Sequence, residues 1–217
     1  MQKKKNFLKI VILGDSGVGK TTILQQYLSG KTGASKPTIG ADFCKKEILI
    51  DNTVVTLQIW DTAGQEKFQS LGYAFYRGAD CCALVYDITS QASFDSLSRW
   101  RDGFHENAGP ADPQSFPFVC LGNKLDSEPE RQVARARGEQ WARDNNNMLF
   151  YETSAVQGTC VEEAFIEMAK RALKRDAESA FVMPTSIASA GGMKLKAKDH
   201  NKERGATTTQ SNCCTIF

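Results

Sequence analysis

The sequence predicts an α/β fold: a six-stranded, mostly parallel sheet with one antiparallel strand and helices on both faces. Two observations predict it. Short apolar runs alternate along the chain with segments in which apolar residues recur at helical spacing. Two of the runs are separated only by Asp51-Asn52-Thr53, which is too short for the crossover that joins parallel strands.

Six apolar runs are the expected strands. The second and third form the antiparallel hairpin, and the others are expected to be parallel because helical segments separate most of them. The runs cover residues 7–13, 43–50, 54–60, 81–87, 116–122 and 148–153.

Helices are predicted between the strands and after the last one. The first covers residues 21–28, and a less clearly patterned one covers residues 132–143. Two others each place apolar side chains on one face. These faces are formed by Phe94, Leu97, Trp100 and Phe104, and by Val161, Phe165, Met168, Ala169, Ala172 and Leu173.

Length and composition bound the organisation of the chain. With 217 residues, a net charge of +2 and 41% hydrophobic residues, it suits one domain with an extension, and nothing favours nucleic acid as a partner. Gly, Ser, Thr, Ala and Lys dominate after residue 176, so we expect a domain over residues 1–176 and a flexible tail over residues 177–217. The seven cysteines lack paired metal-type spacing, which indicates the cytosol. Five are expected to be small buried hydrophobes: Cys44, Cys81, Cys82, Cys120 and Cys160.

Residues 14–21, Gly-Asp-Ser-Gly-Val-Gly-Lys-Thr, match the phosphate-loop pattern G-x-x-x-x-G-K-[ST] between an expected strand and helix. This arrangement directs backbone N–H groups and the positive end of a helix at phosphate. Lys20 is expected to reach the β- and γ-phosphates, and the Thr21 hydroxyl to bind Mg²⁺. An ordinary glycine-rich turn does not require Lys-Thr at its end. The phosphate-binding residues are expected to be Ser16, Gly17, Val18, Gly19, Lys20, Thr21 and Thr22.

A second polar segment, Asp61-Thr62-Ala63-Gly64-Gln65, follows the third strand. Asp61 at a strand end is expected to join the Mg²⁺ shell, Gly64 lets the backbone meet a γ-phosphate, and Gln65 orients the attacking water. Thr38, in the loop before the hairpin, is expected to complete the Mg²⁺ shell only when the γ-phosphate is present, which would make it a switch. Lys20, Thr38 and Gln65 are therefore the expected catalytic residues.

The base is expected to bind at the ends of the last two strands. The Asp126 carboxylate can accept hydrogen bonds from N1–H and N2–H₂ of guanine, a donor pair that adenine lacks. Asn123 can bond the base and brace its loop, while the Lys124 stem lies along the ring. A backbone N–H of the segment after the last strand is expected to reach the guanine oxygen, which involves Ser154, Ala155 and Val156.

Taken in order, these five elements resemble those of the Ras-superfamily small GTPases, whose G domain is a P-loop NTPase fold. Within that superfamily the chain resembles the Rab family over residues 7–175, in segments 39–43, 60–66, 68–71 and 76–80. Segments 71–82 and 112–119 further resemble the late-endosomal and lysosomal Rabs, the seven-type.

The resemblance implies a switch between GDP and GTP, with Mg²⁺, that hydrolyses GTP to GDP and phosphate slowly unless an activating protein accelerates it. It implies recruitment of effectors that regulate vesicle trafficking, at the late endosome, lysosome or phagosome. An exchange factor, an activating protein and the escort protein or GDI are the other implied partners. The implied effector surface is formed by Ile39, Phe43, Trp60 and Phe75; for Trp60, burial in the core is an equal alternative.

The last residues include Cys213 and Cys214, and the final four fit the C-a-a-X prenylation pattern. The resemblance implies two prenyl chains, which would hold the protein on the cytoplasmic face of endomembranes, with a GDI-bound pool in the cytosol. The alternative is a disordered end with two free thiols.

Two departures from the Rab pattern concern the base. Thr32 stands where Rab proteins usually carry a Phe edge-on to guanine, and Val156 replaces a Lys. Both remove contacts, so we expect faster nucleotide release than in typical relatives.

Two other functions remain as alternatives. The first is a P-loop kinase or ATPase, against which Asp126 and segment 152–155 argue. The second is a scaffold locked to its nucleotide, against which Thr38, Gly64 and Gln65 argue.

Overall fold

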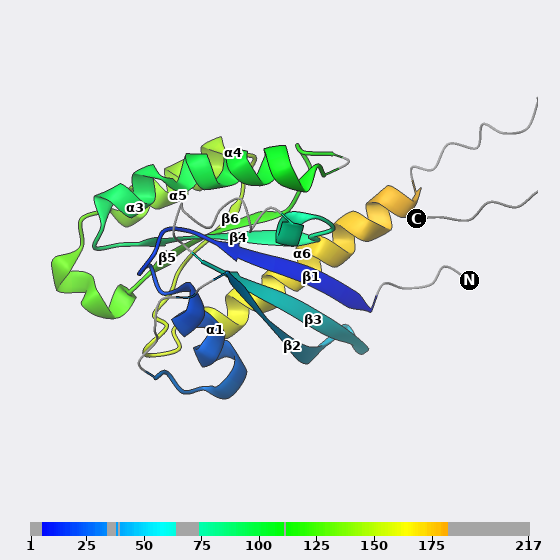
Figure 1. Ribbon diagram of the computed structural model, residues 1–217, viewed down its shortest axis with the longest axis horizontal. Coiled ribbons are helices and arrows are strands. Elements are labelled where there is room, and N and C mark those ends of the chain that lie inside the picture. Colours follow the sequence, from blue (N-terminus) through cyan, green and yellow to red (C-terminus); the bar gives the residue numbers. More distant parts are fainter. Residues whose placement is uncertain (1–5, 34–37, 39, 64–73, 111, 182–217) are drawn as a thin grey trace, which may run out of the picture. The chain divides into compact units, whose positions relative to one another are not determined.

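The computed structural model describes residues 6–33, 38, 40–63, 74–110 and 112–181, and within them the strands form one six-stranded sheet (Figure 1). The strand order is β2-β3-β1-β4-β5-β6. β2 pairs antiparallel with β3, and every other pair is parallel, which confirms the predicted sheet. The strands are β1 (Phe7–Leu13), β2 (Ala41–Ile50), β3 (Thr53–Thr62), β4 (Cys81–Asp87), β5 (Phe118–Asn123) and β6 (Leu149–Glu152).

Helices follow most strands, as the sequence pattern predicts. They are α1 (Lys20–Ser29), α3 (Gln91–Asp95), α4 (Leu97–Ala108), α5 (Arg135–Asp144) and α6 (Val161–Phe181), with a 3₁₀ segment, η2 (Leu125–Glu130).

Two helix boundaries differ from the prediction. The helix predicted over residues 132–143 begins only at Arg135, because the N–H groups of Gln132 and Val133 donate to the carbonyl oxygen of Ile88 at 2.9 and 3.0 Å. The face that begins at Phe94 is divided between α3 and α4 at Ser96. Both breaks lie near the carboxyl end of β4, so the two segments help to shape the edge of the sheet where the polar motifs lie.

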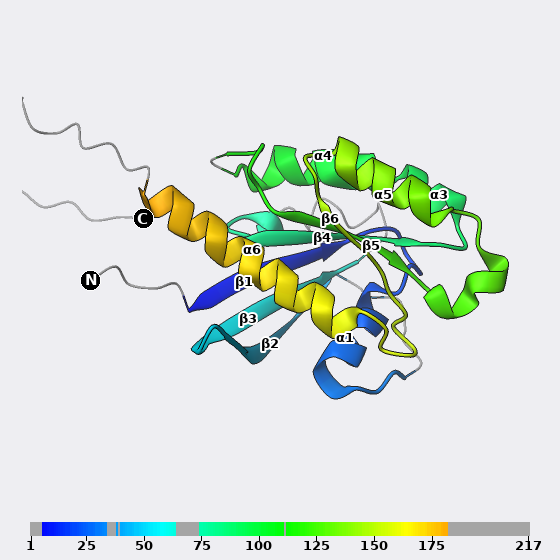
Figure 2. The ribbon, with the colours of Figure 1, turned by 180° about the vertical axis from the view of Figure 1, so that it is seen from behind.

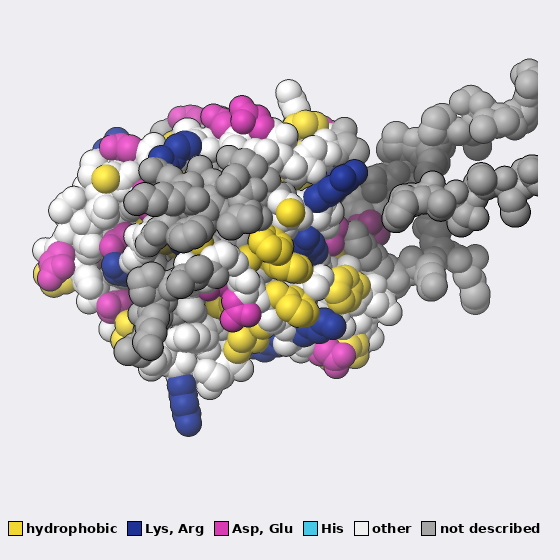
Figure 3. All heavy atoms as spheres, viewed as in Figure 1, with side chains coloured by type: hydrophobic (Ala, Val, Ile, Leu, Met, Phe, Trp, Pro, Cys, Tyr) yellow, Lys and Arg dark blue, Asp and Glu magenta, His cyan; other side chains and the backbone are white. Residues whose placement is uncertain are grey.

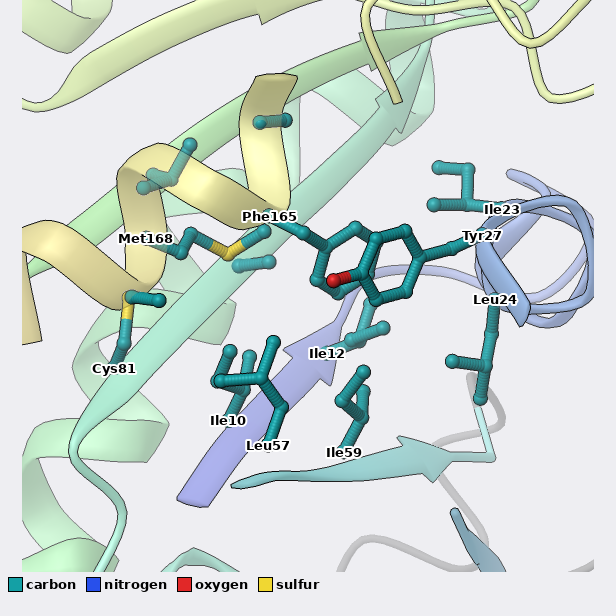
Figure 4. Packing of buried hydrophobic residues seen from close by; sticks show 14 of the residues in the cluster. Ile10, Ile12, Ile23, Leu24, Tyr27, Leu57, Ile59, Cys81, Phe165 and Met168 are labelled. Atoms are coloured by element: carbon teal, nitrogen blue, oxygen red, sulfur yellow. The ribbon is translucent and has the colours of Figure 1, made fainter. Parts of the chain in front are cut away.

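The helices form a layer on each face of the sheet. α1 and α6 cover one face, and α3, α4 and α5 cover the other (Figures 1 and 2). On the first face, Tyr27 of α1 stacks on Phe165 of α6 with ring centroids 3.9 Å apart, above Ile10 and Ile12 of β1 (Figure 4). Successive residues along each strand point alternately to the two helix layers, so the sheet is packed on both faces. The motifs at the strand ends therefore follow directly on closely packed strands.

The cysteines follow the prediction in part. Cys81, Cys82 and Cys120 are buried, and burial raises the pKa of the Cys81 thiol to about 12. Cys44 and Cys160 are only half-buried, because each lies at the edge of its apolar cluster or outside it.

The last helix continues to Phe181, beyond residue 176 where the composition changes. Residues 182–217, and with them Cys213 and Cys214, lie outside the described residues, so the boundary at 176 and the tail stay predictions. Among the helices that the structure describes, none has the length and apolar character needed to cross a membrane.

Candidate functional site

The polar motifs lie at the carboxyl ends of four parallel strands. The phosphate loop follows β1, Asp61 is the last residue but one of β3, Asn123 ends β5, and Ser154 follows β6. In an open α/β sheet this edge is where ligands bind. The topology therefore brings together residues that are more than a hundred positions apart in the sequence.

The phosphate loop requires its glycines. A Cβ on Gly14 would lie 2.1 Å from the carbonyl oxygen of Val85, and one on Gly19 would lie 2.3 Å from Nδ2 of Asn123. Gly17 and Gly19 have φ of 82° and 96°, which side chains disfavour. The backbone can take this tight course only without side chains, and it leads directly into α1.

The first turn of α1 presents backbone donors that no carbonyl of the helix accepts. The first helical hydrogen bond runs from the Ile23 N–H to the Gly19 carbonyl, at 2.8 Å, so the N–H groups before Ile23 have no partner within the helix. In the described part of the chain, no side chain caps this terminus. Uncapped N–H groups at a helix N-terminus favour an anion, and phosphate binding by this terminus stays a prediction.

Lys20 is held inside this loop. Its side chain is 6% exposed, and its Nζ donates to the carbonyl oxygens of Gly14 and Asp15 at 2.8 Å each. Burial lowers the pKa of Lys20 to about 8, although the nearby carboxylates of Asp61 and Asp15 oppose the shift. Among the described residues the hydrogen bonds of this buried ammonium go to neutral carbonyl oxygens, and phosphate groups would supply a directly bonded counter-charge.

Three oxygen-bearing side chains converge beside Lys20. Thr21 Oγ1 donates to Asp61 Oδ2 at 2.5 Å and lies 2.9 Å from Thr38 Oγ1. Thr38 Oγ1 lies 3.4 Å from the same carboxylate oxygen. The chain thus brings together Thr21, Thr38 and Asp61, the three predicted metal ligands.

These residues fit a magnesium ion. The Asp61 carboxyl is buried, its pKa is raised by that burial, and within the described residues its Oδ1 atom has no hydrogen-bond partner. A buried carboxylate oxygen without a partner is costly, and a hard cation would satisfy it. Hydroxyl and carboxylate oxygens are the ligands that Mg²⁺ prefers.

The site has two parts: a phosphate end, formed by the phosphate loop, Thr38 and Asp61, and a base end, formed by residues 123–126 and 154–156. Asn123 connects the two. It is 1% exposed, and its Nδ2 donates to the carbonyl oxygen of Val18 in the phosphate loop at 2.8 Å. Its Oδ1 accepts from Thr153 Oγ1 and from the Ala155 N–H, each at 3.2 Å. These contacts join three separate loops through Asn123, and its role toward a base stays a prediction.

The base end itself is open. Asp126 is exposed, and its Oδ1 accepts from Ser154 Oγ at 2.5 Å. Val156 is 62% exposed. Lys124 has a left-handed backbone, with φ of 71°, and its Nζ pairs with Asp87 Oδ2 at 2.6 Å. Asp126 and Val156 are thus open to solvent, whereas the Lys124 ammonium is engaged by Asp87.

One supporting pair was not predicted. Glu152, buried at the end of β6, accepts from Arg131 Nη1 at 2.6 Å and from Arg131 Nη2 at 3.1 Å. This bidentate pair holds the segment after η2 against the strand that leads to Ser154. The two residues are far apart in the sequence and match no motif, so the pattern gave no signal for their pairing.

Three of the four expected effector residues, Phe43, Trp60 and Phe75, form a contiguous aromatic row. Phe43 is 41% exposed and its ring centroid lies 5.3 Å from that of Trp60, which lies 5.0 Å from Phe75. Trp60 and Phe75 are half-buried, so Trp60 belongs both to the core edge and to the surface. Apolar side chains gather over β1, β2 and β3 on the face that Figure 3 shows. Phe7, Leu49 and Val54 on these strands are exposed.

Five predicted residues cannot be placed. Gly64 and Gln65 follow Asp61, and Ile39 follows Thr38, but all three lie outside the described residues. Cys213 and Cys214 lie outside them as well. The roles predicted for these positions stay predictions.

Comparison with known proteins gives one consistent result. The Ras family model matches residues 9–174. The chain is 50% identical to the Ras-related protein Rab-7b of Paramecium octaurelia over 213 residues, which is 98% of each protein. It is 53% identical to the Ras-related protein Rab-7a of Dictyostelium discoideum, over 85% of this chain and 92% of that one. It is 56% identical to the Ras-related protein Rab7 of Drosophila melanogaster, over 82% of this chain and 86% of that one.

Proposed function

Since this chain belongs to the Ras family and, within it, to the Rab small GTPases, we propose that it is a Mg²⁺-dependent GTP/GDP switch of late endosomes and lysosomes. Its GTP-bound form recruits effectors, and hydrolysis to GDP and phosphate ends the recruitment. The observation that carries the proposal is the convergence of Lys20, Thr21, Thr38 and Asp61 at the head of the phosphate loop.

Each residue of that group has a defined role in the proposal. Lys20 neutralises the β- and γ-phosphates, and the backbone donors at the start of α1 orient them. Thr21, Thr38 and Asp61 hold Mg²⁺, which offsets the charge that develops in the transition state. Gln65 orients the attacking water. Hydrolysis is slow unless an activating protein stimulates it, because none of the residues assigned to the site is an arginine that could stabilise the transition-state charge.

Nucleotide identity is read at the base end. Asp126 accepts from guanine N1–H and N2–H₂, and Asn123 holds its loop against the phosphate loop. Ser154 positions Asp126 through the 2.5 Å hydrogen bond between their side chains. An adenine base would leave the carboxylate without donors, which costs about 1–3 kcal/mol or more.

Partners of four kinds follow from membership of the family. An exchange factor releases GDP, an activating protein stimulates hydrolysis, and an escort protein or GDI carries the prenylated chain through the cytosol. Effectors bind the aromatic row of Phe43, Trp60 and Phe75, with Ile39 beside it. Prenyl groups on Cys213 and Cys214 place the switch on the cytoplasmic face of its membrane, because two chains give stable anchoring.

Hydrolysis is tested with Gln65→Leu. We expect single-turnover GTP hydrolysis stimulated by an activating protein to fall at least about a hundredfold, because the attacking water loses its orienting group. Binding of GTP should not change. Gln140→Leu is the matched control, since Gln140 lies on the surface of α5 and bonds Asp144. Equal stimulated turnover in Gln65→Leu and Gln140→Leu would refute the assignment.

The membrane role is tested with the two cysteines. Intact-mass measurement of the protein from its own cells should show two prenyl groups, and Cys213→Ser with Cys214→Ser should move the tagged protein from late endosomes to the cytosol. Wild-type protein that carries no prenyl group would refute the proposed membrane anchoring.

A further inference from the structure

We propose that Trp100 of α4 is a positioning residue for the phosphate loop, acting through the carboxylate of Asp15. The inference rests on the proposed function, because it concerns how tightly the loop grips nucleotide phosphates. Asp15 is a variable position of the loop pattern, and the roles assigned above do not use its side chain.

Three donors from the start of α4 meet at the Asp15 carboxylate. Ser96 Oγ donates to Oδ2 at 2.6 Å, and Trp100 Nε1 donates to Oδ1 at 2.7 Å. Arg99 Nη2 lies 3.2 Å from Oδ1. The carboxylate also stands beside the N-terminus of α4, where a negative charge is favoured.

The same residue holds Lys20 on its other side. The Asp15 carbonyl oxygen accepts from Lys20 Nζ at 2.8 Å. Gly14 is fixed by its close approach to Val85, whereas Ser16 and Gly17 are exposed. Asp15 is therefore the last tethered residue before the exposed turn, and its side-chain hydrogen bonds set the direction in which its carbonyl and the following N–H groups point.

Burial alone does not account for the indole hydrogen bond. Trp100 is 2% exposed and would pack in the core without any carboxylate. Elsewhere in the described chain, Trp60 Nε1 is buried with no partner, and Trp141 Nε1 has only a hydroxyl of Ser98 at 3.4 Å. Since the fold tolerates those indoles, the short bond of Trp100 to a charged group in the phosphate loop points to a role in the loop.

The three donors differ in how strongly each is expected to fix the Asp15 carboxylate. Trp100 is rigid and buried, so its charge-assisted bond to the partly exposed Asp15 carboxylate is held in one geometry. Arg99 has a side chain that is 48% exposed, and an ion pair at such a position contributes little. The positioning role is therefore assigned to Trp100, with Ser96 in support.

The test is the release rate of mant-GDP from full-length protein with Mg²⁺ present. Trp100→Phe keeps the ring in the core and removes only the donor, so we expect release to accelerate about tenfold. Phe104→Leu is the matched control, because it removes aromatic volume from the same helix without touching Asp15. It should lower the unfolding temperature but leave the release rate unchanged. Equal release rates in Trp100→Phe and wild type, or equal acceleration in both variants, would overturn the proposal.

A second measurement does not depend on replacing the tryptophan. In ¹⁵N-labelled protein, Asp15→Asn should shift the Trp100 indole N–H resonance upfield and leave that of Trp141 in place. Ser96→Ala should accelerate mant-GDP release by a few-fold, and Asp15→Ala, which removes the acceptor, combined with Trp100→Phe should release no faster than Asp15→Ala alone. Additive acceleration in the double variant would show that Trp100 acts by another route and would overturn the proposal. Failure of wild type to bind mant-GDP would instead refute the proposed function.

Discussion

The two ends of the nucleotide site are built differently. At the phosphate end, Lys20 and Asp61 are buried, the glycine backbone is closely packed, and the polar groups bond one another. At the base end, Asn123, Ser154 and Ala155 are buried, but Asp126 and Val156 are exposed. The phosphate end is a product of the fold itself, whereas the base end consists of side chains on loops attached to it.

This difference follows from what each end must recognise. Phosphate is common to all nucleotides, so backbone N–H groups and one lysine suffice, and their positions are fixed by the strand-to-helix turn. A base is distinguished only by the donors and acceptors on its edge, which requires specific side chains. Asn123 joins the two ends, because it bonds Val18 on one side and Ala155 on the other.

The largest expected effect is at the phosphate end. Lys20→Gln should weaken GDP binding about a thousandfold, because a buried charge partner of the phosphates is lost. The matched change at the base end, Lys124→Gln, removes an ammonium that is partly exposed and paired with Asp87. It should weaken GDP binding only a few-fold. Isothermal titration with GDP measures both.

Thermal unfolding provides the control for Lys20→Gln. The free energy of unfolding of the nucleotide-free protein should not fall, since the substitution removes a desolvated ammonium. If the two lysine variants lost affinity equally, the contrast between the two ends would be wrong.

The next largest effect concerns base selection. Asp126→Asn replaces one carboxylate acceptor by an amide donor, so GDP affinity should fall about a hundredfold. ADP binding should not change, because adenine offers no donor pair to lose. Asp144→Asn on α5 is the control and should leave both affinities as they are. A parallel loss of GDP and ADP affinity in Asp126→Asn would place the effect in folding instead of base recognition.

A pH effect of about tenfold is expected from Lys20. Its pKa in the free protein is lowered to about 8, and bound phosphates raise that pKa again. Below pH 8 the lysine is charged in both states and affinity is constant; above pH 8 binding must take up a proton, so GDP affinity should fall about tenfold between pH 7 and pH 9. A GDP titration over this range checks the slope, and Lys20→Gln should show none.

The same shift has the opposite sign for the stability of the nucleotide-free protein. The unfolded chain holds the Lys20 proton up to its ordinary pKa of 10.5, so between pH 8 and that value the unfolded state binds more protons. The contribution of this group to the free energy of unfolding therefore rises with pH over that window. If the GDP affinity of the wild type did not change between pH 7 and pH 9, Lys20 would not lose its proton in this range, and the lowered pKa would be contradicted.

The smallest effect concerns the residues that the Rab pattern lacks. Thr32→Phe should slow GDP release by about three- to tenfold, because an aromatic edge contact to the base is restored. Thr32→Val changes the polarity without adding a ring and should leave the rate as it is. Stopped-flow displacement of mant-GDP measures both variants, and a rate in Thr32→Phe that is unchanged or higher would show that the missing ring does not limit the base end.

Most of the fold and the phosphate end could be predicted from the sequence, for a physical reason. Strands buried on both faces read as continuous apolar runs, and the loop around Lys20 is dictated by local backbone geometry. The start of the helix at Arg135 could not be predicted, because it depends on hydrogen bonds to Ile88 on another element. For the same reason the pairing of Arg131 with Glu152 and the donors around Asp15 appear only in three dimensions.

The most direct test of the account is competition between mant-GDP and mant-ADP for the full-length protein in the presence of Mg²⁺. We propose that Asp126 selects the base beside the phosphate loop, so guanine should bind at least about a thousandfold more tightly than adenine. Equal affinity for the two nucleotides would contradict the account, because phosphate recognition alone would then explain binding.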